Sequence, residues 1–72
     1  MMKKLIHIEG MGCEKCAAHV HEALMSLKSV SDAEVSLSKN CALVTLSGDV
    51  TDSEFKEVIE EAGYEVSKIE AA

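Results

Sequence analysis

Residues 3–20 read KKLIHIEGMGCEKCAAHV, and the hydrophobic period of the chain changes within this stretch. Ile6 and Ile8 alternate with polar neighbours, which predicts a strand over residues 3–9 with both isoleucines facing the core. Two closely spaced glycines then interrupt the alternation and predict a flexible loop. From about residue 14 to residue 27 the period is helical, with one apolar stripe made of Ala17, Val20, Leu24 and Leu27.

The rest of the chain repeats this plan with different loops. Alternation predicts two strands, at residues 33–37 and 42–46, with a hairpin turn at residues 38–40 between them. A second helix follows, whose apolar stripe consists of Phe55, Val58, Ile59 and Ala62. A last short strand is expected from about residue 64 to residue 69.

Both ends of the second helix carry clear signals. Thr51 and Glu54 have the spacing of a capping box, and Val50 can form a hydrophobic staple with Phe55. Gly63 stands where a helix often ends in a left-handed glycine. The sequence therefore predicts both the start and the end of the second helix.

The predicted order of elements is βαββαβ. Right-handed crossovers turn this order into a four-stranded antiparallel sheet with two helices on one face, an α+β sandwich of the ferredoxin-like type. Residues 1–72 are expected to form one domain, since the chain is too short for two. The first strand–helix loop carries cysteine, whereas its counterpart at residues 47–50 carries no soft metal ligand.

Composition narrows the class of function. A net charge of −6 argues against nucleic-acid binding and permits an encounter with a basic protein patch. The apolar stretch near the start is too short for a signal peptide or a membrane span, so we expect a cytoplasmic protein with no direct membrane insertion. Three cysteines, an odd number, favour metal or redox chemistry over a disulfide framework.

Cys13 and Cys16 lie where the loop becomes the helix. Their i, i+3 spacing lets both sulfurs converge, and the free N–H groups of a helix start favour thiolate. Lys15 helps a thiolate and Glu14 opposes it. Two thiolates suit a soft ion such as Cu(I), which accepts two ligands, whereas Zn²⁺ usually takes four. The spacing of the two cysteines alone does not distinguish a metal-binding site from a site of thiol–disulfide chemistry.

The chain resembles the heavy-metal-associated domain family, which includes copper metallochaperones and the N-terminal domains of heavy-metal-pumping ATPases. The resemblance rests on residues 10–16 (GMGCEKC), on Val20 and Leu24, and on residues 62–64 (AGY), and it extends over about residues 3–69. It implies the βαββαβ fold and metal binding by Cys13 and Cys16. The chain departs from the family pattern at Gly12, where Thr or Ser is common, and at Ser29, where Gly is common.

The resemblance also implies roles for residues beside the two cysteines. The methionine matching Met11 packs under the metal loop in this family, so we expect it to support the loop rather than bind the ion. Tyr64 matches a position that is Tyr in many bacterial members, and its hydroxyl is expected to approach the sulfurs.

Three further side chains are candidates for additional ligands to a divalent ion. Glu14 follows the first cysteine, and His19 lies one turn after Cys16 and leans back toward it. Cys41 opens the third predicted strand, next to a hairpin expected at the same end of the domain as the metal loop. Each of the last two also has an ordinary explanation, a solvated histidine and a small strand residue.

We therefore expect a non-enzymatic carrier that binds Cu(I) through Cys13 and Cys16 and passes it on by ligand exchange. The expected partner is a heavy-metal-transporting P-type ATPase or another CxxC domain, and the protein is a monomer unless two copies share one ion. Alternatives are a carrier of Zn²⁺, Cd²⁺ or Hg²⁺ and a domain of a metal-pumping ATPase. A thioredoxin-like oxidoreductase fits poorly because the chain has no proline to face the cysteines.

Overall fold

A computed structural model describes residues 2–72. Its elements follow the predicted order: β1 (Met2–Glu9), α1 (Glu14–Met25), β2 (Val30–Ser36), β3 (Cys41–Leu46), α2 (Asp52–Glu61) and β4 (Glu65–Ala71).

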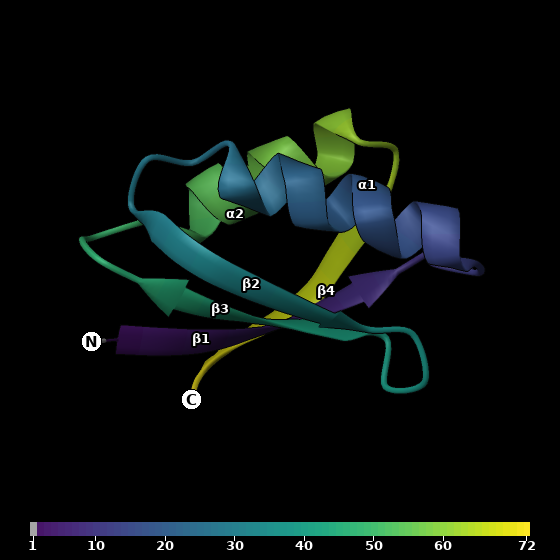
Figure 1. Ribbon diagram of the computed structural model, residues 1–72, viewed down its shortest axis with the longest axis horizontal. Helices are drawn as coiled ribbons and strands as arrows, with labels where there is room; N and C mark the ends of the chain where they lie inside the picture. The colour runs from purple at the N-terminus through teal and green to yellow at the C-terminus, as the bar shows by residue number, and fades with distance from the viewer. Residues whose placement is uncertain (1) are drawn as a thin grey trace.

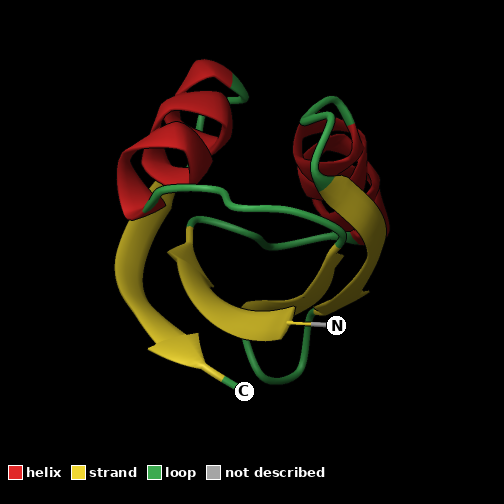
Figure 2. Ribbon diagram, turned by 90° about the vertical axis from the view of Figure 1, so that its left-hand side faces the viewer, coloured by secondary structure: helices red, strands yellow, loops and turns green. Residues whose placement is uncertain are grey.

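The four strands form one sheet in the order β2-β3-β1-β4. Every neighbouring pair is antiparallel, as the crossover argument predicts. Figure 1 shows α1 and α2 side by side over the sheet, and Figure 2 shows that both cover the same face. The α+β, ferredoxin-like prediction is confirmed.

The core lies between the sheet and the two helices. Ile6 and Ile8 of β1 are almost completely buried, as their alternation predicts. Each helix contributes its stripe, and the side chains buried most completely are Val20, Leu24, Phe55 and Ile59. With no tryptophan in the chain, close packing of aliphatic side chains around one phenylalanine has to supply the stability of this small domain.

The predicted boundaries differ from the observed ones by up to three residues. β2 begins at Val30, not residue 33, and Val30 is buried against Leu46 of β3. The register of the pair shifts between Val30 and Asp32, so the polar–apolar alternation that marks a strand is lost there. Helix α1 ends at Met25, and Leu27 packs against the core from the following turn.

The two ends of α2 match their sequence signals. The Thr51 hydroxyl accepts a hydrogen bond from the Glu54 backbone N–H at 3.3 Å and donates to the Glu54 carboxylate at 3.4 Å, while Val50 and Phe55 are both buried. The return bond of a full capping box, from the Thr51 backbone to the Glu54 side chain, is replaced by this hydroxyl contact. Gly63 has φ +96° directly after the C-cap residue Ala62, as predicted for the left-handed end of a helix.

Neither helix within residues 2–72 has the length and apolar character that crossing a membrane requires.

Thr51→Ala is expected to lower the free energy of unfolding by about 1 kcal/mol, because it removes the side-chain acceptor of the Glu54 N–H and leaves this group only the Thr51 backbone carbonyl. Urea denaturation of the apo protein measures this loss. Ser53 is exposed and is the second residue of α2, so Ser53→Ala is the control. Its free energy of unfolding should stay within about 0.5 kcal/mol of that of the parent protein. Equal losses in both variants would contradict a capping role for Thr51.

Two glycines of the β1–α1 loop should respond in opposite directions to alanine. Gly10 has φ +98°, so Gly10→Ala forces an L-residue into the left-handed region at a cost of roughly 1–2 kcal/mol. Gly12 has ordinary backbone angles, and a Cβ placed there meets no atom within 4 Å. Gly12→Ala should therefore stabilise the protein by about 0.4–1 kcal/mol, chiefly through the unfolded chain. Thermal denaturation of both variants checks the signs, and a loss at Gly12 matching that at Gly10 would refute this account.

Candidate metal centre

The loop from Gly10 to Cys13 carries the chain from β1 into α1. At Gly10, a Cβ atom would stand 3.5 Å from a ring carbon of Tyr64. The backbone of the loop therefore passes close to this ring, and Met11 turns into the core, where only 8% of the residue is exposed. Burial of Met11 in the core cluster agrees with a packing role under the loop.

Cys13 and Cys16 bring their sulfur atoms together at the start of α1. The two Sγ atoms are 3.1 Å apart, well beyond the roughly 2.05 Å of a disulfide, and both cysteines are free thiols. Cys13 is the N-cap residue and is exposed, whereas Cys16 is half-buried and packs against the core. One sulfur thus faces solvent from the loop while the other is held by the helix.

The start of α1 has no side-chain cap among these residues, since Cys13 makes no capping hydrogen bond. The N–H groups that open a helix need acceptors, and they favour negative charge nearby. Cys13 occupies the N-cap position, which a serine or threonine takes in an ordinary helix start.

Hydrogen bonds lower the pKa of the Cys16 thiol from 9.0 to about 7. The Tyr64 hydroxyl makes the largest contribution, followed by the backbone of Gly12 and the thiol of Cys13. The same contact raises the pKa of Tyr64 to about 12, because a phenolate could no longer donate to the sulfur. A substantial part of Cys16 is therefore thiolate at neutral pH.

Tyr64 reaches this position through the end of α2. Gly63 has a left-handed backbone, and its N–H donates to the Glu60 carbonyl at 3.0 Å. The Tyr64 N–H donates to the Ile59 carbonyl at 3.1 Å. This pair of bonds is a Schellman motif, which turns the chain back over the last helical turn. The motif fixes the Tyr64 backbone, and the half-buried ring packs against the core beside the metal loop.

The other candidate ligands do not join the two cysteines. Within residues 2–72, no three His, Cys, Asp or Glu side chains lie close enough together to hold one ion. Glu14 is exposed in the first turn of α1, and His19 lines a groove between the two helices with residues of α2.

Cys41 opens β3 directly after the hairpin, and its side chain lies on the face of the sheet that the helices do not cover. The hairpin before it is at the expected end, because the Ile8 N–H donates to the Asn40 carbonyl at 2.8 Å and Asn40 shares a cavity of about 330 Å³ with Gly10 and Met11. Ala42, the next residue, belongs to the core, so Cys41 points to the face that the helices leave uncovered. It is nonetheless only 6% exposed.

Sequence reasoning did not anticipate two features of the centre. One is the contribution of the Gly12 and Cys13 backbone to the lowered pKa of Cys16. The other is the close approach of Gly10 to Tyr64, for which the only signal was a glycine directly after the strand.

Comparison with known proteins finds relatives along nearly the whole chain. The copper chaperone CopZ of Staphylococcus epidermidis is 46% identical over 67 residues, which cover 92% of this chain and 98% of that protein. A mercuric reductase of Shewanella putrefaciens is 40% identical over 60 residues, which cover 83% of this chain but only 11% of the reductase.

Among solved structures, the copper-binding domain from HMA7, a P-type ATPase, superposes with a TM-score of 0.82 at 36% sequence identity. The match covers all of this chain and 95% of that domain. The model of the heavy-metal-associated domain matches residues 5–65. The chain belongs to the heavy-metal-associated domain family.

Proposed function

We propose that this protein carries Cu(I), bound by the thiolates of Cys13 and Cys16, and passes it to a partner by ligand exchange. The observation that carries the proposal is the pair of sulfurs 3.1 Å apart at an exposed helix start. The similarity to the copper chaperone CopZ over 98% of that protein's length supports the same function.

The choice of ion follows from the number and kind of donors. Two sulfur ligands are soft, and they can complete the coordination of Cu(I), which accepts two ligands. A structural zinc site takes four ligands, and the described residues 2–72 bring no third His, Cys, Asp or Glu to the pair. The lowered pKa of Cys16 also favours binding. A thiol must lose its proton to bind a metal ion, and a smaller fraction of Cys16 is protonated at neutral pH.

The unequal exposure of the two cysteines suggests how the ion leaves. A thiolate of the partner adds to the ion from the solvent side, so that three sulfurs share it briefly. Exposed Cys13 then releases the ion and takes up a proton, and half-buried Cys16 follows when a second partner thiolate arrives. No covalent bond of a substrate is made or broken, so the protein is a carrier and not an enzyme.

The proposed recipient is a heavy-metal-transporting P-type ATPase or another domain with a CxxC pair. The 36% sequence identity between this chain and a copper-binding domain of a P-type ATPase supports this proposal. A partner of the same fold would present its own thiol pair at a helix start, which matches the exchange of like ligands. The cytoplasm is the proposed location, because its reducing conditions keep both thiols free.

Transport of Hg²⁺ is the second candidate. Mercury also accepts two thiolates, and the similarity to 11% of a mercuric reductase favours testing it. Zn²⁺ and Cd²⁺ would need ligands from a second molecule. Thiol–disulfide exchange is the remaining chemistry open to two sulfurs at this distance, and its signature would be catalysed disulfide reduction without tight metal binding.

Titration of the reduced protein with Cu(I) against a chromogenic chelator tests the proposal. We expect tight one-to-one binding that Cys13→Ser and Cys16→Ser each weaken by more than the roughly 10- to 100-fold typical for loss of an outer-shell partner. Cys41→Ser is the matched control and should leave the Cu(I) affinity unchanged. Parallel titrations with Hg²⁺ and Zn²⁺ rank the ions. Failure to compete with the chelator for Cu(I) would refute the proposal.

Tyr64→Phe should raise the pKa of Cys16 from about 7, because it removes the largest contribution that lowers it. The ring is kept, so its packing against Gly10 is preserved. At neutral pH less Cys16 is thiolate in the variant, and alkylation by iodoacetamide at this residue, followed by peptide mapping, should be slower. The midpoint of the pH–rate curve should move to higher pH, and an unchanged midpoint would show that the hydroxyl does not support the thiolate.

A further inference from the structure

The end of strand β1 decides where the metal loop begins, because Gly10 directly follows Glu9, the last residue of the strand. β1 is a central strand with β4 on one side and β3 on the other, and pairing on both sides is irregular at this end. On the β4 side the register shifts between His7 and Ile8, and Ser67 lies between the partners of these two residues. The Ser67 hydroxyl donates to the His7 carbonyl at 3.3 Å. A bulge of this kind bends the strand that carries it and ends regular pairing.

On the β3 side, the regular ladder stops one residue short of Ile8. The last pair of this ladder joins His7 to Cys41, the first residue of β3. The Ile8 N–H donates instead to the carbonyl of Asn40, in the hairpin before β3, at 2.8 Å. Ile8 is only 1% exposed, so water does not reach this group, and its hydrogen bond depends on Asn40.

Asn40 presents its carbonyl to Ile8 from a left-handed backbone. Its φ is +53°, and among residues 2–72 it is the one non-glycine residue with a positive φ. Asparagine enters this region far more readily than other residues that carry a Cβ, whereas a β-branched residue is a genuine outlier there. The residue type at position 40 therefore controls whether the hairpin can hold the end of β1.

The same hairpin faces the metal loop across a cavity of about 330 Å³. Asn40 lines this cavity from the hairpin, and Gly10 and Met11 line it from the loop. The two sulfurs differ in what holds them, because Cys16 belongs to α1 and packs against the core, whereas Cys13 precedes the helix and is carried by the loop. A displaced end of β1 would therefore move Cys13 relative to Cys16.

We propose that Asn40 is a positioning residue for the metal centre. Its left-handed backbone holds the end of β1 through the Ile8 N–H, and the strand end in turn sets the path of the loop that carries Cys13. Asn40 acts through this hydrogen bond and not as a ligand. The proposal rests on the proposed carrier function for its biological use, whereas the contact between Asn40 and Ile8 belongs to the apo protein and can be tested without an ion.

Asn40→Val and Asn40→Gly form a matched pair, because both remove the amide side chain but only glycine adopts a positive φ readily. We expect Asn40→Val to bind Cu(I) about 3- to 10-fold more weakly than the parent protein, less than the roughly 10- to 100-fold typical for loss of an outer-shell partner. Asn40→Gly should bind within about twofold of the parent protein, since the backbone conformation is kept. Competition with a chromogenic chelator measures all three affinities.

Ser38→Val is the control for a valine in the hairpin. Ser38 is exposed and does not have a positive φ, so its replacement should leave the Cu(I) affinity within about twofold of the parent value.

Amide hydrogen exchange in the apo, reduced protein tests the contact itself. In Asn40→Val the Ile8 N–H should lose its protection, and the NMR shifts of residues 10–13 should change. Ile6, which pairs with Ala42 in the regular part of the ladder, should stay protected. In Asn40→Gly the protection of Ile8 should be retained.

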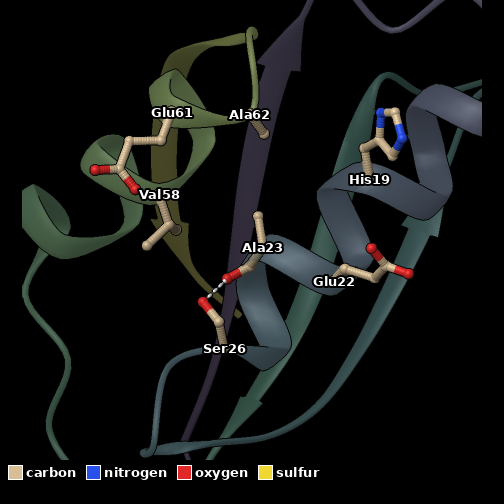
Figure 3. A pocket seen from close by; sticks show the side chains of 7 residues that line it. All are labelled: His19, Glu22, Ala23, Ser26, Val58, Glu61 and Ala62. Carbon is tan, nitrogen blue, oxygen red and sulfur yellow. Dashed lines mark hydrogen bonds between the residues drawn. The ribbon is translucent and has the colours of Figure 1, made fainter.

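The same spectra check the rest of the fold. Ala23 and Val58 come one from each of the helical stripes that line the groove between α1 and α2 (Figure 3), and their shifts should not change. Should thermal denaturation show that Asn40→Val does not fold, Asn40→Ala takes its place, because alanine also carries a Cβ into the left-handed region but lacks the branch.

Two results would overturn the positioning role. One is parent-like Cu(I) affinity in Asn40→Val although its Ile8 N–H has lost protection. The other is equal weakening of Cu(I) binding by Asn40→Val and by Asn40→Gly or Ser38→Val. If the parent protein itself fails to bind Cu(I), the carrier function is refuted, and the exchange at Ile8 and the shifts of residues 10–13 still decide whether Asn40 positions the loop.

Discussion

The N–H groups at the start of an α-helix need acceptors, and the candidate centre is built on the way α1 meets this requirement. Cys13, at the N-cap, makes no capping hydrogen bond, and the backbone of Gly12 and Cys13 contributes to the lowered pKa of Cys16. Val20 and Leu24, further along the same helix, are completely buried against the sheet. The helix start is therefore held in place by the core, while the loop before it remains at the surface.

The two halves of the fold use the same position differently. At the start of α2, Thr51 supplies an ordinary cap through its hydroxyl. At the start of α1, Cys13 occupies the N-cap position, but its side chain makes no capping hydrogen bond. The second half also serves the first, because the turn at Gly63 brings Tyr64 to the Cys16 sulfur. One half thus provides the two candidate ligands, and the other provides a donor that lowers the pKa of one of them.

Most of the fold could be predicted because its signals are local. Apolar residues at every second position mark β1 and β3, and capping residues mark both ends of α2. The start of β2 was missed because an irregular register at Val30 to Asp32 breaks the alternation, and alternation is all that a single sequence offers there. The burial of Cys41 could not be predicted either, since alternation assigns it to the uncovered face and does not show that long neighbouring side chains shield it.

For the candidate centre, spacing alone predicted that Cys13 and Cys16 meet, but not which chemistry they perform. The position of Tyr64 came from the family resemblance, because the contact joins residues 48 positions apart and no local pattern encodes it. The backbone donors to Cys16 depend on the three-dimensional path of the loop. The groove between the helices escapes sequence analysis for a related reason, since each of its stripes looks like an ordinary solvated helix edge until the two are seen together.

The shielding of Cys41 has a consequence for how the protein meets oxidants. Oxidants such as peroxide react first with accessible cysteines, so we expect Cys13 to form a sulfenic acid before Cys41 does. The Cys16 sulfur lies 3.1 Å away, so its attack on this sulfenic acid, with loss of water, would close an internal disulfide. The third thiol is withheld from both steps, which spares the molecule covalent cross-links to its neighbours, and oxidative damage takes a form that cellular reductants can reverse.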